Sequence, residues 1–308
     1  MSNQFVASTI ALAAVVAVAS LMPPPAIAQP EGWVTESVCP DNTATVFHRC
    51  ALEAAQAFDP PRVPDGGPDL GGIWRLRAPG MYEDLEAHPR TEDDQGGPGG
   101  IVDPPDGKVP MHAWADARRR ENADSYIHHN AACLLSGVPE TMYMGGTFQF
   151  LQTPEQLLML SEDAHAYRSI PLDGRSHISE NIRLWNGDST GHWEGNTLVI
   201  ETTNQNGKPW LDQRARFYTE EAYVVERLTL IDANTLHYEA TIDDPNVYTQ
   251  PFTIVLAYRR STVEGFEIMA MACYENNEAL MDLYRGVGYG TYPGISAAEA
   301  REALEAGR

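Results

Sequence analysis

The sequence predicts an all-β protein, in which an antiparallel meander closes into a calycin- or lipocalin-like barrel or folds as a sandwich, with a few peripheral helices. After Cys133 the chain consists mainly of short runs of apolar, β-branched and aromatic residues, which are typical of strands. Residues 236–242 alternate apolar and polar side chains with the period of two that marks a half-buried strand. Short turns such as Gly195-Asn196 separate the runs, and turns of this length join antiparallel neighbours.

The expected elements follow one another along the chain. A first strand covers residues 70–76, and a helix covers residues 111–122. Between them, residues 89–110 are rich in Gly and Pro and are expected to form a long irregular loop. The later strands are expected at residues 148–152, 156–161, 167–172, 198–203, 224–231, 235–242, 252–259 and 267–274.

The pattern divides the chain into four regions. Residues 1–28 are expected to be a signal peptide, because they hold no charged side chain and end in the small-x-small pattern of a cleavage site. Residues 29–69 form an N-terminal extension with one helix and a Pro-rich linker. Residues 70–290 form a single β-rich domain, and residues 291–308 form a C-terminal helix that begins with a capping box. We therefore expect a periplasmic or secreted protein without stable membrane insertion after signal cleavage.

The charge of the chain excludes some classes of partner. It carries 43 acidic and 21 basic residues, which gives a formal net charge of −22 at pH 7. This charge repels nucleic acid and anionic membrane surfaces, whose binding needs clustered Lys and Arg. The basic cluster at residues 118–120 is followed directly by Glu121 and is typical of a solvated helix face. The expected partner is a small-molecule ligand, and the oligomeric state is not predicted.

The four cysteines of an exported protein are expected to pair. Cys39 and Cys50 flank a short segment and favour a local loop, which leaves Cys133 and Cys273 for a long-range bond. The other two connectivities stay open. A metal site made of cysteines is disfavoured, because no pair has the close spacing that zinc sites use.

The densest chemistry lies between His165 and Asp212, where aromatic and charged residues alternate with short strands and tight turns. This segment is too polar for plain core and too aromatic for plain loop, so we expect it to contribute the wall of a small-molecule site. The side chains predicted to contact a substrate are Tyr167, Arg168, Trp185, Trp193 and Arg227.

Acid–base chemistry fits these residue types best. A histidine such as His177 takes and gives protons near neutral pH. Asp188 and Asp212 follow strand ends beside tryptophans, and an indole that desolvates a carboxyl group raises its pKa, as a general acid requires. The alternative is that each aspartate caps a turn through its own backbone. The predicted catalytic residues are thus His177, Asp188 and Asp212.

These residues predict a cofactor-independent enzyme, a lyase, isomerase or hydrolase, which acts on a small, partly apolar or aromatic metabolite. The alternative is a non-catalytic binding protein with a calycin-like pocket. No cofactor is expected, because the sequence has no phosphate loop or dinucleotide fingerprint. No metal is expected either: His128 and His129 are the one adjacent pair among nine histidines, and neighbours in a strand point to opposite faces.

Two other motifs favour structural roles. The segment GDSTG at residues 187–191 matches the pattern of a nucleophile elbow, but that motif needs a helix after Ser189, and a hairpin signal follows instead. We interpret it as a turn framed by glycines. Glu226 and Arg227 lie within an apolar strand, so one of them must face inward, where we expect a structural ion pair. The alternative is an arginine that binds a substrate carboxylate or carbonyl.

Several blocks of the sequence resemble a largely uncharacterised family of exported bacterial β-rich proteins. The blocks are IVDPPDGKVP (101–110), HAYRSIPLDGRSH (165–177), RLWNGDSTGHWEGNTLVIETTN (183–204), WLD (210–212), YEATIDDPNVYTQPF (238–252) and CYENN (273–277). The resemblance covers residues 70–285 and implies a shared fold and a shared site, but no reaction. The chain departs from the family at Tyr218-Thr219, where His-Ser is usual, and at Tyr223, Tyr274 and His192, where His, His and Arg are usual.

Overall fold

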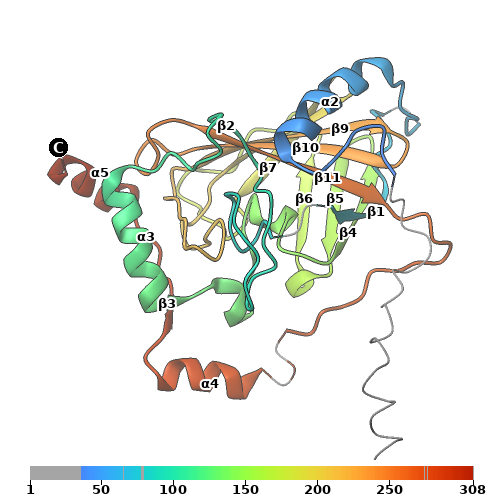
Figure 1. The fold of residues 1–308 in the computed structure, drawn as a ribbon. Coiled ribbons are helices and arrows are strands. Elements are labelled where there is room, and N and C mark those ends of the chain that lie inside the picture. The colour runs from blue at the N-terminus through green and yellow to red at the C-terminus, as the bar shows by residue number, and fades with distance from the viewer. Residues whose placement is uncertain (1–35, 65, 78–79, 274, 276, 308) are drawn as a thin grey trace, which may run out of the picture. The chain divides into compact units, whose positions relative to one another are not determined.

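The computed structural model describes residues 36–64, 66–77, 80–273, 275 and 277–307 (Figure 1). The expected signal peptide at residues 1–28 lies outside the described residues. In the described part of the chain, no helix has both the length and the apolar character needed to cross a membrane.

A mostly antiparallel sheet that nearly closes into a barrel dominates the fold, as the sequence predicts (Figure 1). Its strands follow the order β6-β5-β4-β1-β11-β10-β9-β8-β7, and β2 pairs with β11 beside this path. They are β1 (Gly72–Leu76), β2 (Ile101–Asp103), β4 (Thr147–Thr153), β5 (Gln156–Ser161), β6 (Tyr167–Pro171), β7 (Asp188–Glu194), β8 (Thr197–Thr203), β9 (Tyr223–Asp232), β10 (Thr235–Asp243) and β11 (Phe252–Arg260).

The first strand in the sequence lies in the middle of the sheet. Trp74 of β1 is opposite Phe148 of β4 on one side and Arg260 of β11 on the other. On either side of β1, strands that are neighbours in sequence pair with each other, as short connections favour. β1 therefore joins two groups of strands, β4–β6 and β7–β11.

β6 and β7 are the two edges of the sheet, and the line along which they meet is called the seam below. No backbone ladder joins these two strands in the part of the chain that the structure describes. The edges approach closely at Gly191, where an added Cβ would lie 2.7 Å from Leu172 Cδ2 and 3.1 Å from Ile170 Cγ2. A side chain at position 191 would therefore have to displace the ends of the Leu172 and Ile170 side chains.

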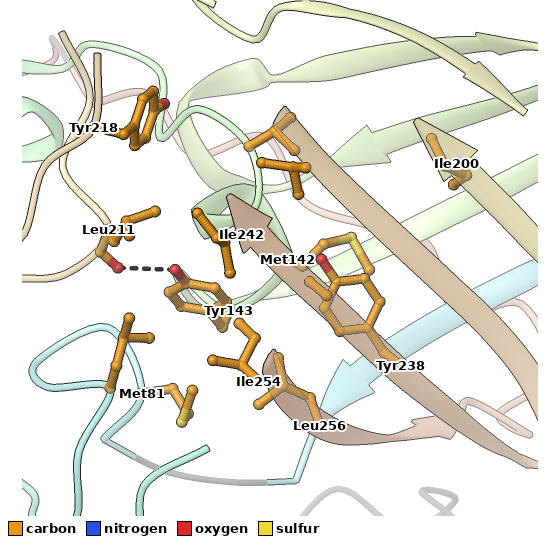
Figure 2. Close-up of a cluster of buried hydrophobic side chains, with 14 of the residues drawn as sticks. Met81, Met142, Tyr143, Ile200, Leu211, Tyr218, Tyr238, Ile242, Ile254 and Leu256 are labelled. Atoms are coloured by element: carbon orange, nitrogen blue, oxygen red, sulfur yellow. Dashed lines mark hydrogen bonds between the residues drawn. The ribbon is translucent and has the colours of Figure 1, made fainter. Parts of the chain in front are cut away.

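Large side chains fill the interior of the barrel. Trp74, Phe150, Tyr238 and Tyr258 are fully buried, and the hydroxyl of Tyr258 donates to the carbonyl of Met142 at 2.6 Å. Figure 2 shows part of this core, including Tyr143, whose hydroxyl donates to the carbonyl of Leu211 at 2.8 Å. An eight-stranded ligand-binding barrel keeps such an interior open for its ligand. Here side chains occupy this space, which disfavours a calycin-like internal pocket.

Helix α2 (Ala44–Ala57) of the N-terminal extension covers the outer face of β9 and β11 (Figure 1). It begins at Thr43, whose side chain accepts a hydrogen bond from the N–H of Val46. Phe47 and Ala51 of this helix pack against Ile231, Val255 and Ala257 of the sheet. The extension is thus part of the folded protein.

The remaining described helices and short strands come, in sequence, either between the strands of the sheet or after β11. They are β3 (Tyr126–Ile127), α3 (Ala113–Ser125), α4 (Glu278–Gly286), β12 (Gly290–Thr291), α5 (Ala297–Ala306) and the 3-10 helices η1 (His129–Ala132), η2 (Glu140–Met142) and η3 (Asp163–His165). α5 begins with the capping box predicted from Ser296 and Glu299.

Both predicted disulfides are confirmed. Cys39 bonds to Cys50 and Cys133 bonds to Cys273, each with a Cα–Cα distance of 5.6 Å, within the range of unstrained bridges. The long-range bond ties the segment after β11 to the chain before β4.

Three predicted elements differ from the structure. The expected irregular loop at residues 89–110 contains β2 (Ile101–Asp103), which pairs with β11. The expected strand at residues 267–274 is wrong: residues 267–273 form no strand, and Met269 and Met271 point into solvent. Such a strand would have paired with the edge of β11 that β10 leaves open, but β1 already pairs with that edge. The expected turn at residues 187–191 is also wrong: the turn lies at residues 185–186, Gly187 follows it with a φ of 67° that suits glycine, and β7 starts at Asp188.

Candidate functional site

A pocket of about 450 Å³ opens at the seam, a volume typical of small-molecule sites. Both edge strands line it: Tyr167, Arg168 and Ser169 come from β6, and Asp188 and Ser189 come from β7. The loop at residues 184–187, with Trp185, forms a further wall, together with Arg175, Leu135 and Ala166. The structure therefore brings four predicted site residues, Tyr167, Arg168, Trp185 and Asp188, into one concavity.

Asp188 is the centre of a hydrogen-bonded array at the rim of this pocket. Its Oδ1 accepts from Nη2 of Arg175 at 2.9 Å, and its Oδ2 accepts from Nδ1 of His177 at 3.0 Å and from the N–H of Ile178 at 3.2 Å. Burial alone would raise the pKa of Asp188, but the hydrogen bonds from Arg175, His177 and Ile178 outweigh it and hold this pKa below the usual value. Asp188 is therefore ionised, contrary to the expectation of a desolvated acid.

His177 is oriented by this carboxylate. Because Nδ1 donates to Asp188, the neutral ring presents the lone pair of Nε2, which lies 3.4 Å from Oγ1 of Thr190. The His177 side chain is 26% exposed, so small molecules and water reach it. It stands beside the pocket rather than among the residues that line it. The arrangement fixes Nδ1 on a carboxylate, while Nε2 has only a long hydrogen bond to the Thr190 hydroxyl to give up before it takes a proton.

Two aromatic side chains give the pocket its apolar surface. Tyr167 is 69% exposed at its edge, and Trp185 is held in place by a hydrogen bond from its indole N–H to the carbonyl of Leu135. Trp193, expected in the same wall, does not line the pocket. Its ring covers Gly67 of the linker, where an added Cβ would lie 2.1 Å from the indole.

Arg168 lines the pocket, but its donors are engaged by the protein. Its guanidinium binds Glu226 inside the barrel, with Nη1 2.9 Å from Oε1, and also donates to Ser189 Oγ at 3.1 Å and to Thr202 Oγ1 at 2.8 Å. Tyr238 donates to the same carboxylate at 2.9 Å. Burial opposes the charge of Arg168, but Glu226 outweighs it and raises the arginine pKa. We call this network, which joins β6 to β7, β8 and β9, the seam clasp.

The seam clasp contains Ser189 and Glu226, two residues for which the sequence left alternative roles open. Ser189 accepts hydrogen bonds from Arg168, and β7 continues from it into a hairpin, so the nucleophile-elbow interpretation stays disfavoured. The prediction of an inward-facing charge on β9 is confirmed, with Glu226 buried and Arg168 as its partner. Arg227 points outward and binds Glu194 at 2.8 Å, away from the pocket.

Asp212 lies in a different buried network. It pairs with Arg216 and accepts from the N–H groups of Leu85 at 3.1 Å and Arg214 at 3.1 Å. Burial raises its pKa, as predicted, although Arg216 opposes the shift. Asp212 does not line the seam pocket, so the structure does not bring it together with His177 and Asp188.

Sequence reasoning missed a buried cluster of His128, His129 and Glu140 behind this site. Because η1 starts at His129, the two histidines do not alternate as in a strand, and both reach Glu140, at Nε2–O distances of 2.9 and 2.6 Å. The ring of His129 meets Trp185 edge-on, with centroids 6.3 Å apart. The cluster thus lies one aromatic ring away from the pocket.

The tautomers of this cluster disfavour metal binding. Nδ1 of His128 accepts from the N–H of Asn130 at 3.3 Å, and Nδ1 of His129 accepts from the N–H of Trp210 at 3.2 Å. In a neutral ring the proton then sits on Nε2, the atom that faces Glu140 and would have to bind the ion. Burial lowers the pKa of His129, although Glu140 opposes the shift, so its ring is neutral near pH 7. In the cluster, His129 hydrogen-bonds to one oxygen of Glu140, whereas Nε2 of His128 lies 2.9 Å from the other oxygen without a hydrogen bond.

A larger hollow of about 550 Å³ lies between α4 and residues 132–134. Its charged side chains, Glu278, Asp282 and Arg285, all come from one helix of exposed residues. The hollow therefore lacks the desolvated, convergent polar groups that distinguish the seam pocket.

Comparison with known proteins adds no assignment. No protein-family model matches the chain, and no curated protein matches it. The resemblance to exported bacterial β-rich proteins stays a prediction.

Proposed function

We propose that the protein is a cofactor-independent enzyme, a lyase, isomerase or hydrolase, that acts by acid–base chemistry on a small, partly apolar or aromatic metabolite at the seam pocket. The observation that carries the proposal is the Arg175–Asp188–His177 array beside a pocket walled by Trp185. The two disulfides support a periplasmic or secreted location, because such bonds persist in oxidising compartments.

In this proposal His177 is the acid–base group. Nε2 takes a proton from the substrate or from water, and the ionised Asp188 stabilises the imidazolium that forms, through the Nδ1–H bond. The same Nε2–H then returns the proton to another substrate atom or to a leaving group. Arg175 is a positioning residue, since it keeps the pKa of Asp188 low and its carboxylate fixed.

The walls of the pocket suit the proposed substrate class. Trp185 and Tyr167 offer aromatic surface to an apolar or aromatic group. The two charged side chains that the edge strands contribute to the pocket, Arg168 and Asp188, are already paired within the protein. A ligand that contacts them therefore meets polar groups whose charges are already neutralised, so the substrate does not have to be strongly charged.

A non-catalytic small-molecule binding protein is the alternative that one observation favours. Arg168, Asp188 and Ser189 all have protein partners already, so the pocket can hold a ligand by its aromatic walls without any titrating group. Such a protein would use the seam pocket, because side chains fill the barrel interior.

The test separates turnover from binding. Small aromatic and apolar metabolites are screened for a shift in melting temperature, and each hit is then incubated with the protein and followed by NMR. Turnover by the wild type that is lost in His177→Gln supports the proposal. His192→Gln is the matched control, since His192 also faces a carboxylate, Glu194, but lies on the outer surface at 3.3 Å from it.

Other outcomes overturn the proposal. If the wild type binds a ligand and never transforms it, the protein is a binding protein. If a chelator abolishes turnover and a divalent ion restores it, the reaction depends on a metal and the cofactor-independent assignment is wrong.

A further inference from the structure

Three side chains outside the barrel converge between α2 and β10, on the opposite side of the sheet wall from the seam clasp. His237 and Glu239 are two residues apart on β10, so they point to the same face of the strand. His48 of α2 lies over them: its Nδ1 is 3.0 Å from Nε2 of His237 and 3.8 Å from Oε2 of Glu239. One ligand atom from each residue lies within 4.8 Å of the other two.

The state of these groups suits coordination. His237 is 4% exposed, and its Nε2 faces Nδ1 of His48 at 3.0 Å. His48 and Glu239 keep 24% and 21% of their side-chain surface exposed, which provides a route for an ion and room for water.

The arginine nearest in the sheet does not bind the carboxylate of Glu239, so this carboxylate can bind a metal ion. Arg227 is directly opposite Glu239 in the β9–β10 ladder, but its guanidinium binds Glu194 at 2.8 Å. Glu239 instead faces His48. Its acceptor capacity is therefore not taken by the nearest arginine.

The buried cluster of His128, His129 and Glu140 makes a useful contrast. Backbone N–H groups there fix the proton of each ring on the nitrogen that faces the carboxylate. At the outer cluster the two facing nitrogens, Nδ1 of His48 and Nε2 of His237, hold at most one proton between them when both rings are neutral. Moving that proton to the far nitrogen of the same ring frees both lone pairs.

We propose that His48, His237 and Glu239 bind one divalent transition-metal ion of the zinc class, with water completing its coordination. With metal–ligand bonds of about 2.0–2.1 Å, the 3.0 Å and 3.8 Å separations correspond to angles of roughly 95° and 135° at the ion, within reach of a distorted tetrahedral or five-coordinate site. Two imidazoles and one carboxylate favour zinc, copper or nickel over magnesium and calcium.

The ion has a structural consequence that is independent of the proposed enzyme activity. His48 belongs to the N-terminal extension, whereas His237 and Glu239 belong to the sheet, so the metal cross-links α2 to β10. An ion that binds the folded state alone raises stability by mass action. The extension is then held by the ion as well as by its apolar face.

The experiment uses the chain without a histidine tag, dialysed against a chelator and then titrated with Zn²⁺ by calorimetry and with Co²⁺ by visible absorbance. The wild type is expected to bind one equivalent, and Zn²⁺ is expected to raise its melting temperature while Mg²⁺ is not. His48→Gln and Glu239→Gln, at partly exposed positions that should tolerate the change, should each weaken binding at least tenfold. His192→Gln is the control on an exposed histidine and should bind as the wild type does.

Three results would overturn the site. They are no Zn²⁺ binding by the wild type, unchanged affinity in His48→Gln, and loss of binding in His129→Gln with retention in His48→Gln. The last result would place the ion in the buried cluster instead. Turnover at the seam pocket is not part of the readout, so failure of either proposal leaves the other standing.

Discussion

Two arginine–carboxylate pairs border the seam pocket, and they differ in their burial and in the other side chains to which they hydrogen-bond. Arg168 and Glu226 are almost completely buried, and their remaining partners, Ser189, Thr202 and Tyr238, are side chains of the barrel wall. The side chain of Arg175 is 35% exposed, and its partner Asp188 holds His177, a side chain that solvent reaches.

The difference shows how burial assigns a role to the same pair of residue types. A buried pair that loses one partner leaves an uncompensated charge, so Arg168 and Glu226 are committed to the fold. The pair of Arg175 and Asp188 carries less of the fold and instead fixes the orientation and charge state of groups around His177. Mutations in the first pair should change stability, and mutations in the second should change activity.

The largest effect is expected from Arg168→Met. It leaves Glu226 buried without its cation and removes the contacts from β6 to β7, β8 and β9, so the free energy of unfolding should fall by about 3–5 kcal/mol. Denaturant unfolding followed by circular dichroism measures the loss. The double variant Arg168→Met/Glu226→Gln removes the stranded charge and should recover part of it. Equal stability of Arg168→Met and the wild type would show that the seam clasp does not hold the barrel closed.

His177→Gln and Asp188→Asn should leave the fold intact and lower turnover by about 10²–10⁴-fold, the usual contribution of a general acid–base group. The comparison requires an identified substrate, found as described above, and steady-state kinetics of both variants. Circular dichroism spectra and melting temperatures serve as the check on folding. Full turnover in both variants would remove His177 and Asp188 from the chemistry.

The pH dependence of stability sharpens the same comparison. Because the folded-state pKa of Asp188 is lowered, its contribution is fully present above the unfolded value of about 3.9 and is lost as the pH falls through the lower folded value. The stability advantage of the wild type over Asp188→Asn should therefore shrink on acidification from about pH 5 to about pH 2. Urea unfolding of both proteins across that range measures it. A constant difference would mean that Asp188 titrates normally.

The smallest effect is expected from Arg227→Ala. Arg227 pairs with Glu194 on the outer surface, where exposed ion pairs contribute little and are screened by salt. We expect no measurable change in the unfolding midpoint and no change in ligand binding. A weakened affinity for a ligand of the seam pocket would restore Arg227 as a substrate-binding residue.

The sheet could be predicted well because its strands carry their own signals. The sequence predicts strands at residues 156–161 and 235–242, which form β5 and most of β10, because an apolar run and an alternating pattern are both local signals. The partner of β11 is not local. Residues 267–274 show strand-forming character, but the edge beside β11 is taken by β1 from the start of the domain. Competition between distant segments decides such pairings, and a single segment does not reveal it.

The site could be predicted in part for the same reason. Tyr167, Arg168, Trp185 and Asp188 meet because β6 and β7 form the two edges of one barrel, so the polar block that contains them borders one pocket. Trp193 lies at the far end of β7, and Asp212 lies in a loop closed by its ion pair with Arg216. The local sequence does not distinguish these two residues from the ones that line the pocket. The sequence predicts that His128 and His129 point to opposite faces of a strand, whereas the 3-10 turn that begins at His129 lets both rings reach Glu140.

The central position of β1 has a consequence for the order in which the protein assembles during synthesis. β7 to β11 pair with their sequence neighbours and can form hairpins as soon as each has emerged, whereas Trp74 has to wait for Arg260. The short apolar strand β1 is thus synthesised early, whereas β11, its second partner, is the last strand of this sheet to be made. Long-range pairing of this kind slows folding and leaves strand edges exposed until β11 is available.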